Sequence, residues 1–141
     1  MKEESINKPF IGLFSELLIS STTFQAGGVY ILKDKDVLFP SRTNIKDEDK
    51  PRMVIVMGRE KELNDPLIEY VQAIPITTCF KLETTHDYPL DKGAGNLHYN
   101  SLAKAGLIQP ILKTNIEGKI GQLPPEIYDD VKATVMVNLD I

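Results

Sequence analysis

The sequence predicts a mainly β protein: a small curved antiparallel sheet or barrel with a C-terminal helix and a short N-terminal helix. Short apolar runs rich in β-branched residues recur through the middle of the chain. Apolar residues at helical spacing occur only near the two ends. Because the apolar runs do not alternate with helices, the pattern argues against a parallel sheet of βαβ units.

Length and composition indicate one soluble globular domain. The chain has 141 residues, of which 42% are hydrophobic and 26% are charged. The net charge of −4 argues against a protein that coats nucleic acid, because such binding needs lysine and arginine to neutralise phosphates; a local groove stays possible. The single cysteine, Cys79, cannot form an intramolecular disulfide, so we expect a cytoplasmic protein. No apolar run approaches the roughly 20 residues of a membrane span, so no membrane is expected.

Residues 1–25 form an N-terminal extension, and residues 26–141 form the main domain. Within the extension, Pro9 fits the first turn of a short amphipathic helix that runs to residue 19. Its apolar positions at helical spacing are Phe10, Leu13, Phe14, Leu17 and Leu18. This apolar face either caps the core of the domain or contributes to an interface with another subunit or partner.

The strands are predicted in chain order from the apolar runs and the residues that interrupt them. They cover residues 26–32, 52–57, 67–78, 80–90 and 107–112. Residues 41–50 are a predicted loop, residues 58–66 a loop or a strand extension, residues 91–96 a turn, and residues 113–121 a loop or a tight strand pair. Pro75 marks an edge, a bulge or the end of its strand, because proline has no N–H to donate to a ladder.

The last element is a helix that opens at Pro124 and Pro125. Proline is well suited to the first helical turn. The apolar positions Ile127, Val131, Val135 and Leu139 fall near one face of this helix. The helix therefore closes the domain with one apolar side.

Arg52 stands at the start of one predicted strand, and Thr77 and Thr78 stand at the end of another. A guanidinium together with hydroxyl groups indicates a phosphate site. The alternatives are structural: Arg52 also fits a salt bridge at a strand end, and threonine favours strands. The nucleotide-binding and hydrolase motifs are absent, and His86 and His98 lack neighbours at metal-ligand spacing. We therefore expect neither a metal nor a cofactor.

Five short motifs, taken in order, resemble the MazF/PemK family of endoribonuclease toxins. They are GGVY at 27–30, KPRMVIV at 50–56, IPITT at 74–78, SLA at 101–103 followed by IQP at 108–110, and GQLPPE at 121–126. The resemblance covers about residues 26–141. It implies the SH3-like barrel of the MazF, PemK and CcdB toxins, with a terminal helix, in a homodimer.

The resemblance also implies a function and a site. Such a protein is a toxin that cleaves single-stranded RNA at short sequence motifs, without metal, by attack of the 2′-hydroxyl, and an antitoxin neutralises it. Arg52 matches the catalytic arginine of the family, and Thr77 matches its active-site threonine. Thr78 and Gln109 match positions near the RNA groove, and Arg42 in the 41–50 loop joins them as an RNA-binding candidate.

Several alternatives stay open at this stage. Gln109 also fits a structural role, in which it satisfies backbone groups beside Pro110. The base that accepts the 2′-proton is unassigned; Asp34, Asp36 and Asp47 are acidic candidates in the residues that precede Arg52. The competing function is a non-catalytic binding module of the same fold, either a poison of DNA gyrase or a protein that only binds RNA.

Overall fold

A computed structural model describes residues 23–38 and 50–141 of the chain, which fold into antiparallel strands and two helices. The strands are β1 (Gly28–Lys33), β2 (Pro51–Met57), β3 (Tyr70–Thr77), β4 (Tyr88–Leu90), β5 (Ser101–Ala103), β6 (Gln109–Leu112) and β7 (Ile116–Gln122). The helices are α2 (Glu60–Leu63) and α3 (Pro125–Leu139). The predicted N-terminal helix lies outside the described residues, as do Arg42 and Asp47.

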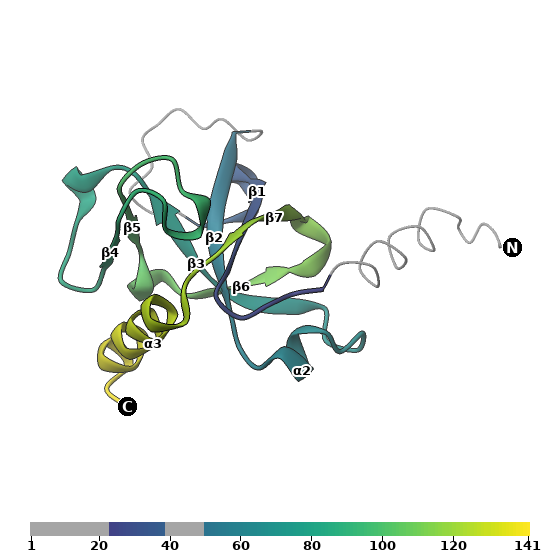
Figure 1. Cartoon of the computed structure of the whole chain (residues 1–141). Helices are drawn as coiled ribbons and strands as arrows, with labels where there is room; N and C mark the ends of the chain where they lie inside the picture. Colours follow the sequence, from purple (N-terminus) through teal and green to yellow (C-terminus); the bar gives the residue numbers. More distant parts are fainter. Residues whose placement is uncertain (1–22, 39–49) are drawn as a thin grey trace, which may run out of the picture.

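The strands form one antiparallel sheet in the order β4-β5-β3-β2-β1-β7, and β6 pairs separately with β3. The sheet curves strongly, with β1, β2 and β7 at one side and β4 and β5 at the other (Figure 1). Among the described residues no pairing joins β7 to β4 or to β6, so the sheet stays open rather than closing into a complete barrel. The mainly β prediction is confirmed, in this open form.

Two apolar cores lie on opposite faces of the central strands. Val29 and Ile55 point into a first core that also contains Val131 and Val135 of α3. Their neighbours along the strands point into a second core, which contains Phe24, Tyr30, Leu32, Val37, Val54, Val56, Leu63, Val71, Ala73 and Ile111. Burial on both faces explains why β1 and β2 read as unbroken apolar runs rather than as alternating sequences.

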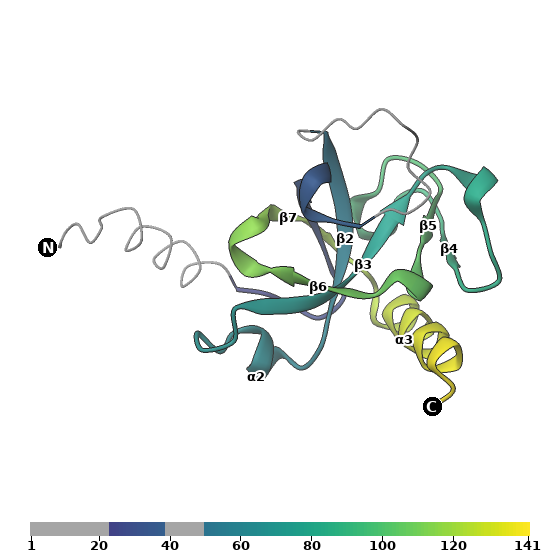
Figure 2. The same ribbon diagram turned by 180° about the vertical axis from the view of Figure 1, so that it is seen from behind.

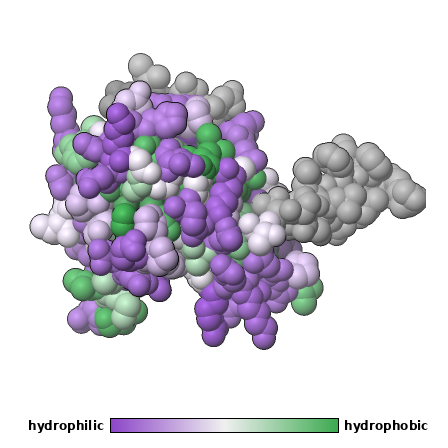
Figure 3. All heavy atoms as spheres, viewed as in Figure 1, coloured by the Kyte–Doolittle hydropathy of each residue, from purple (hydrophilic) through white to green (hydrophobic). Residues whose placement is uncertain are grey.

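The helix α3 begins at Pro125, as its sequence predicts, and covers one end of the sheet beside β4. It lies away from the short helix α2 in both views (Figures 1 and 2). Towards its C-terminus the apolar side chains Met136, Val137, Leu139 and Ile141 are exposed. The C-terminal end of the chain lies at the lower left of Figure 3, where green hydrophobic atoms reach the surface. The predicted Leu139 therefore faces solvent, and only the first part of the apolar stripe packs on the core.

Three elements differ from the predictions. The strand β5 lies where the apolar runs alone predict no strand, α2 lies within the predicted loop or strand extension at 58–66, and β7 replaces the predicted loop or tight strand pair at 113–121. The sequence of β7 contains Gly118 and Gly121, which weaken a strand signal. Its formation depends on tertiary pairing with β1 from Gly28 to Leu32.

Pro75 lies inside the sheet, opposite Val54 of β2. On its other side, β3 pairs with β6 as far as Ala73 and then with β5 from Ile76. Pro75 thus occupies the position where β3 exchanges one partner strand for another. The missing N–H costs no ladder bond there, because neither partner strand is in register with it.

Candidate functional site

The sheet brings Arg52 and Thr77 to the same end of two neighbouring strands. The register between β2 and β3 pairs Met53 with Ile76. Because the strands are antiparallel, Arg52 and Thr77 are the next residues across from each other, and they share one face of the sheet. Side chains that lie opposite each other in this way have Cβ atoms roughly 5 Å apart. The two residues predicted to be catalytic are therefore adjacent.

A buried carboxylate holds Arg52 in place. The Nε atom of Arg52 lies 2.7 Å from Oδ1 of Asp34, which belongs to the short turn η1 (Asp34–Asp36) after β1. Asp34 is 1% exposed, whereas 23% of the Arg52 side chain is exposed. The backbone N–H of Asp34 donates to Lys50 O at 2.8 Å and fixes the turn against the start of β2. The buried Asp34 therefore holds the guanidinium of Arg52 on its inner side, while part of the Arg52 side chain still reaches the surface.

Thr77 is oriented by its own chain. Its Oγ1 accepts a hydrogen bond of 3.1 Å from the backbone N–H of Cys79, and the residue is 8% exposed. A hydroxyl has one donor and two acceptor sites, so this contact leaves its hydrogen available to an acceptor. Arg52 and Thr77 together present donors at one point, which suits an anionic phosphate.

The side chain of Gln109 is occupied by the protein backbone. Gln109 lies opposite Ala73 of β3, and its Oε1 accepts the N–H of Leu38 at 2.8 Å. Its Nε2 donates to Leu38 O at 3.3 Å and to Leu107 O at 3.0 Å. This geometry matches the structural role left open by the sequence. Gln109 fixes the chain that continues from η1, the turn that also holds Asp34.

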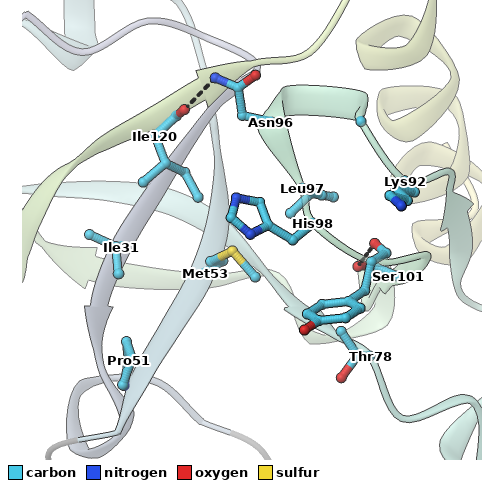
Figure 4. A pocket seen from close by; sticks show the side chains of 12 residues that line it. Ile31, Pro51, Met53, Thr78, Lys92, Asn96, Leu97, His98, Ser101 and Ile120 are labelled. Carbon is cyan, nitrogen blue, oxygen red and sulfur yellow. Dashed lines mark hydrogen bonds between the residues drawn. The ribbon is translucent and has the colours of Figure 1, made fainter.

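Thr78 faces a pocket on the opposite side of the sheet from Thr77. The pocket has a volume of about 1130 Å³ and is also lined by Met53, Ile31 and Ile120. In Figure 4, His98 projects over Met53 into the middle of this pocket, with Thr78 and Ser101 on the far side. Thr78 is therefore separated from Arg52 by the strand backbone, although the two lie near the same strand ends.

Comparison with known proteins rests on structure, because no protein-family model and no curated protein matches this sequence. The Mycobacterium tuberculosis toxin MazF-mt6 superimposes with a TM-score of 0.61 at 22% identity, over 81% of this chain and 97% of that one. A chain of the MazE-MazF structure from Deinococcus radiodurans gives a TM-score of 0.63 at 14% identity, over 85% of this chain and 98% of that one. This chain has the MazF fold.

Another structure with the MazF fold is an endoribonuclease in complex with its cognate antitoxin, from a mycobacterial species. It gives a TM-score of 0.61 at 11% identity, over 85% of this chain and 96% of that one. The fold predicted from the five motifs is confirmed by these similarities. Because the sequence identities are low, the similarities show the fold of this chain. Its chemistry has to be argued from its own residues.

Within the MazF fold of this chain, the sequence predictions divide into two groups. Arg52 and Thr77 come together, whereas Thr78 and Gln109 lie apart from them and from each other. The role of Asp34 as the partner of Arg52 was not predicted. Eighteen residues separate the two, and only the pairing of β1 with β2 brings them into contact.

The described part of the chain offers no evident metal site. Across residues 23–38 and 50–141, no three His, Cys, Asp or Glu side chains lie close enough together to hold a metal ion. Within the same ranges, no helix combines the length and the apolar character that crossing a membrane requires.

Proposed function

We propose that this protein is an endoribonuclease toxin that cleaves single-stranded RNA at short sequence motifs without a metal ion, and that Arg52 and Thr77 carry the reaction. The observation that supports this most is the Arg52 guanidinium, held by the buried Asp34 carboxylate and set beside the Thr77 hydroxyl. The similarity to MazF toxins supports the same reaction class.

The reaction needs little from the protein beyond positioning and charge. The 2′-oxygen of the RNA attacks the adjacent phosphorus and loses its proton, and the bond from phosphorus to the 5′-oxygen breaks. The products are a 2′,3′-cyclic phosphate and a 5′-hydroxyl, whose oxygen gains a proton. The Arg52 guanidinium stabilises the negative charge on the phosphorane oxygens. Thr77 donates its hydroxyl hydrogen to the phosphate and holds it in line for the attack.

Asp34 positions Arg52 and does not accept the proton of the 2′-hydroxyl. Its Oδ1 contacts Arg52 Nε, and the residue is buried, so RNA at the surface does not reach it. Of the three acidic candidates for the base, Asp36 is half-buried in the same turn and Asp47 lies outside the described residues. Arg52 and Thr77 therefore stabilise the charge of the transition state, and no residue is assigned as the base.

An antitoxin and a second copy of the chain are the expected partners, in the cytoplasm. The structures that share the fold include an endoribonuclease in complex with its cognate antitoxin, from a mycobacterial species, and the MazE-MazF structures from Deinococcus radiodurans. Val137 near the end of α3 and Ile141 just after it are 77% and 78% exposed, and they offer an apolar surface for such contacts. Light scattering during size-exclusion chromatography tests the dimer, which has twice the 15.8 kDa mass of the chain.

The test of the reaction uses purified protein and a long single-stranded RNA in EDTA. We expect discrete fragments that end in a cyclic phosphate, and a rate reduced about a hundredfold or more in Arg52→Ala. Arg52→Lys keeps the charge but loses the planar fork, and it should also be slow. Arg59→Ala is the matched control, because 83% of its side chain is exposed beside α2. Intact RNA with folded wild-type protein would refute the proposal.

The second candidate function is an RNA-binding module that does not cleave. The ion pair between Asp34 and Arg52 favours binding without cleavage. The Asp34 carboxylate neutralises part of the positive charge of Arg52, which would otherwise stabilise the phosphorane. This candidate predicts a shift of labelled RNA in a native gel and no fragments. The same incubation therefore separates the two functions.

A further inference from the structure

The pocket behind Arg52 and Thr77 has the chemistry of a nucleotide site. Its floor is apolar and comes from Ile31 of β1, Met53 of β2 and Ile120 of β7. Two of its lining residues, Met53 and Thr78, directly follow Arg52 and Thr77 in the sequence. The pocket therefore begins where the candidate catalytic site ends, around the same two strand ends.

Four polar side chains stand around this floor, and we call them the rim groups: Thr78, Lys92, His98 and Tyr99. Within residues 23–38 and 50–141, their side-chain polar atoms make no hydrogen bond or ion pair. Other polar residues of the pocket are used by the fold. Asn96 Nδ2 donates to Ile120 O at 2.7 Å, and the Ser101 hydroxyl donates to Tyr99 O at 2.8 Å.

The rim groups are mostly donors. Lysine offers only donors, and the threonine, histidine and tyrosine side chains each offer one together with an acceptor. None of the described residues that line the pocket is an aspartate or a glutamate, although the protein carries a net charge of −4. The matching ligand is therefore rich in acceptors and negatively charged.

Two of the rim groups also offer flat rings. His98 projects over Met53 into the pocket (Figure 4), and Tyr99 is 70% exposed. Unpaired bases are held in this way, by stacking on aromatic or histidine rings with a cation nearby for the phosphate. Apolar floor, exposed rings, free donors and a lysine together fit a nucleotide better than they fit an aliphatic peptide.

We propose that this pocket binds one unpaired base of the RNA next to the scissile phosphate, with His98 and Tyr99 against the base and Lys92 at the following phosphate. This inference rests on the proposed function, because it concerns where the RNA cleaved at Arg52 and Thr77 binds. It assigns part of the sequence specificity to His98 and Tyr99. Thr78 adds a hydroxyl that donates to an acceptor on the base or the sugar.

The first experiment measures binding without cleavage. The probe is a fluorescein-labelled single-stranded RNA of mixed sequence with 2′-O-methyl groups throughout, which lack the attacking hydroxyl. His98→Ala and Tyr99→Ala should each weaken binding about tenfold, the effect of losing one stacked base. The logarithm of the association constant falls as the logarithm of the salt concentration rises. Lys92→Gln should make this slope less steep by about 0.7, the value for one phosphate contact on a single strand.

Matched controls come from the same chain. Tyr70→Ala removes a tyrosine that is 48% exposed at the far end of β3 from Thr77, and Lys61→Gln removes an exposed lysine of α2. Both controls should bind the probe like the wild type. The second experiment maps the cleavage sites of the wild type and of His98→Ala in a long RNA, and the preferred base at one position beside the cut should relax.

The outcomes separate this inference from the proposed function. If the wild type binds the probe but never cleaves RNA, the nuclease proposal fails, and weaker binding by the rim variants still supports the pocket. If the wild type cleaves and the rim variants bind and cut as it does, the pocket inference is overturned. It is also overturned if His98→Ala or Tyr99→Ala converts a dimer to a monomer, because the occupant is then a second copy of the chain.

Discussion

The ion pair between Asp34 and Arg52 should couple the two residues strongly in stability, and a double-mutant cycle measures this coupling. Breaking a fully buried pair costs about 3–5 kcal/mol, whereas an exposed pair contributes about 0–1 kcal/mol. Asp34 is 1% exposed and the Arg52 side chain is 23% exposed, so this pair lies between the two limits. We expect a coupling energy of about 2 kcal/mol.

The two single variants should also differ. Arg52→Ala removes the guanidinium that lies 2.7 Å from the buried Asp34 carboxylate, whereas Asp34→Ala leaves a guanidinium that water can partly solvate. Arg52→Ala should therefore be the more destabilising of the two. The double variant should lose less stability than the two single losses added together.

Urea unfolding followed by far-ultraviolet circular dichroism gives the four free energies of the cycle. The exposed pair between Arg59 and Glu62, with a 2.6 Å contact and side chains 83% and 51% exposed, is the control cycle, with an expected coupling below about 1 kcal/mol. High salt should weaken the control coupling more than that of the buried pair. If the coupling of Asp34 with Arg52 is no larger than that of the control pair, the buried anchor has no energetic basis.

Three further predictions follow from other parts of the fold. Gln109→Ala should lower the rate of RNA cleavage while leaving binding of the 2′-O-methyl probe unchanged, because its amide holds Leu38; weaker binding at an unchanged rate would instead show an RNA contact. Gly121→Ala should destabilise the protein by about 1–3 kcal/mol in urea unfolding, since its Cβ would collide with the Gly95 carbonyl, whereas Gly118→Ala in the same strand meets open space and should be tolerated. Burial raises the pKa of the Tyr30 hydroxyl above its ordinary value of about 10. The folded state therefore favours the neutral hydroxyl, and the stability that this provides is complete below the unfolded pKa and is lost as pH rises above it. Tyr30→Phe should remove this alkaline loss, and equal slopes of stability against pH for the two proteins would contradict the assignment.

Much of the sheet could be predicted because the residues within single strands, without their partners, already show an apolar β-strand pattern. The middle parts of β1 and β2 are buried on both faces, so apolar side chains fill residues 29–32 and 53–57, and these runs stand out from the polar connections. The start of α3 is equally local, since a proline in the first turn needs no partner elsewhere. By contrast, β7 is rich in glycine and half exposed, and only pairing with β1 makes it a strand.

The site divides in the same way. Arg52 and Thr77 could be named from short motifs, and the antiparallel register then brings them together. Gln109 was also named, yet what its amide binds depends on Leu38, which is 71 residues away. A side chain's residue type is a property of the sequence, whereas its hydrogen-bond partner is a property of the folded chain.

The sequence by itself determined the mainly β character, the closing helix and the candidate pair at two strand ends. Only the tertiary structure decided that Asp34 anchors Arg52, that Thr78 faces away from Thr77 and that Lys92, His98 and Tyr99 surround a pocket beside them. The physical reason is the range of the interactions. Strand and helix signals arise between near neighbours, whereas an ion pair or a pocket forms where distant segments meet.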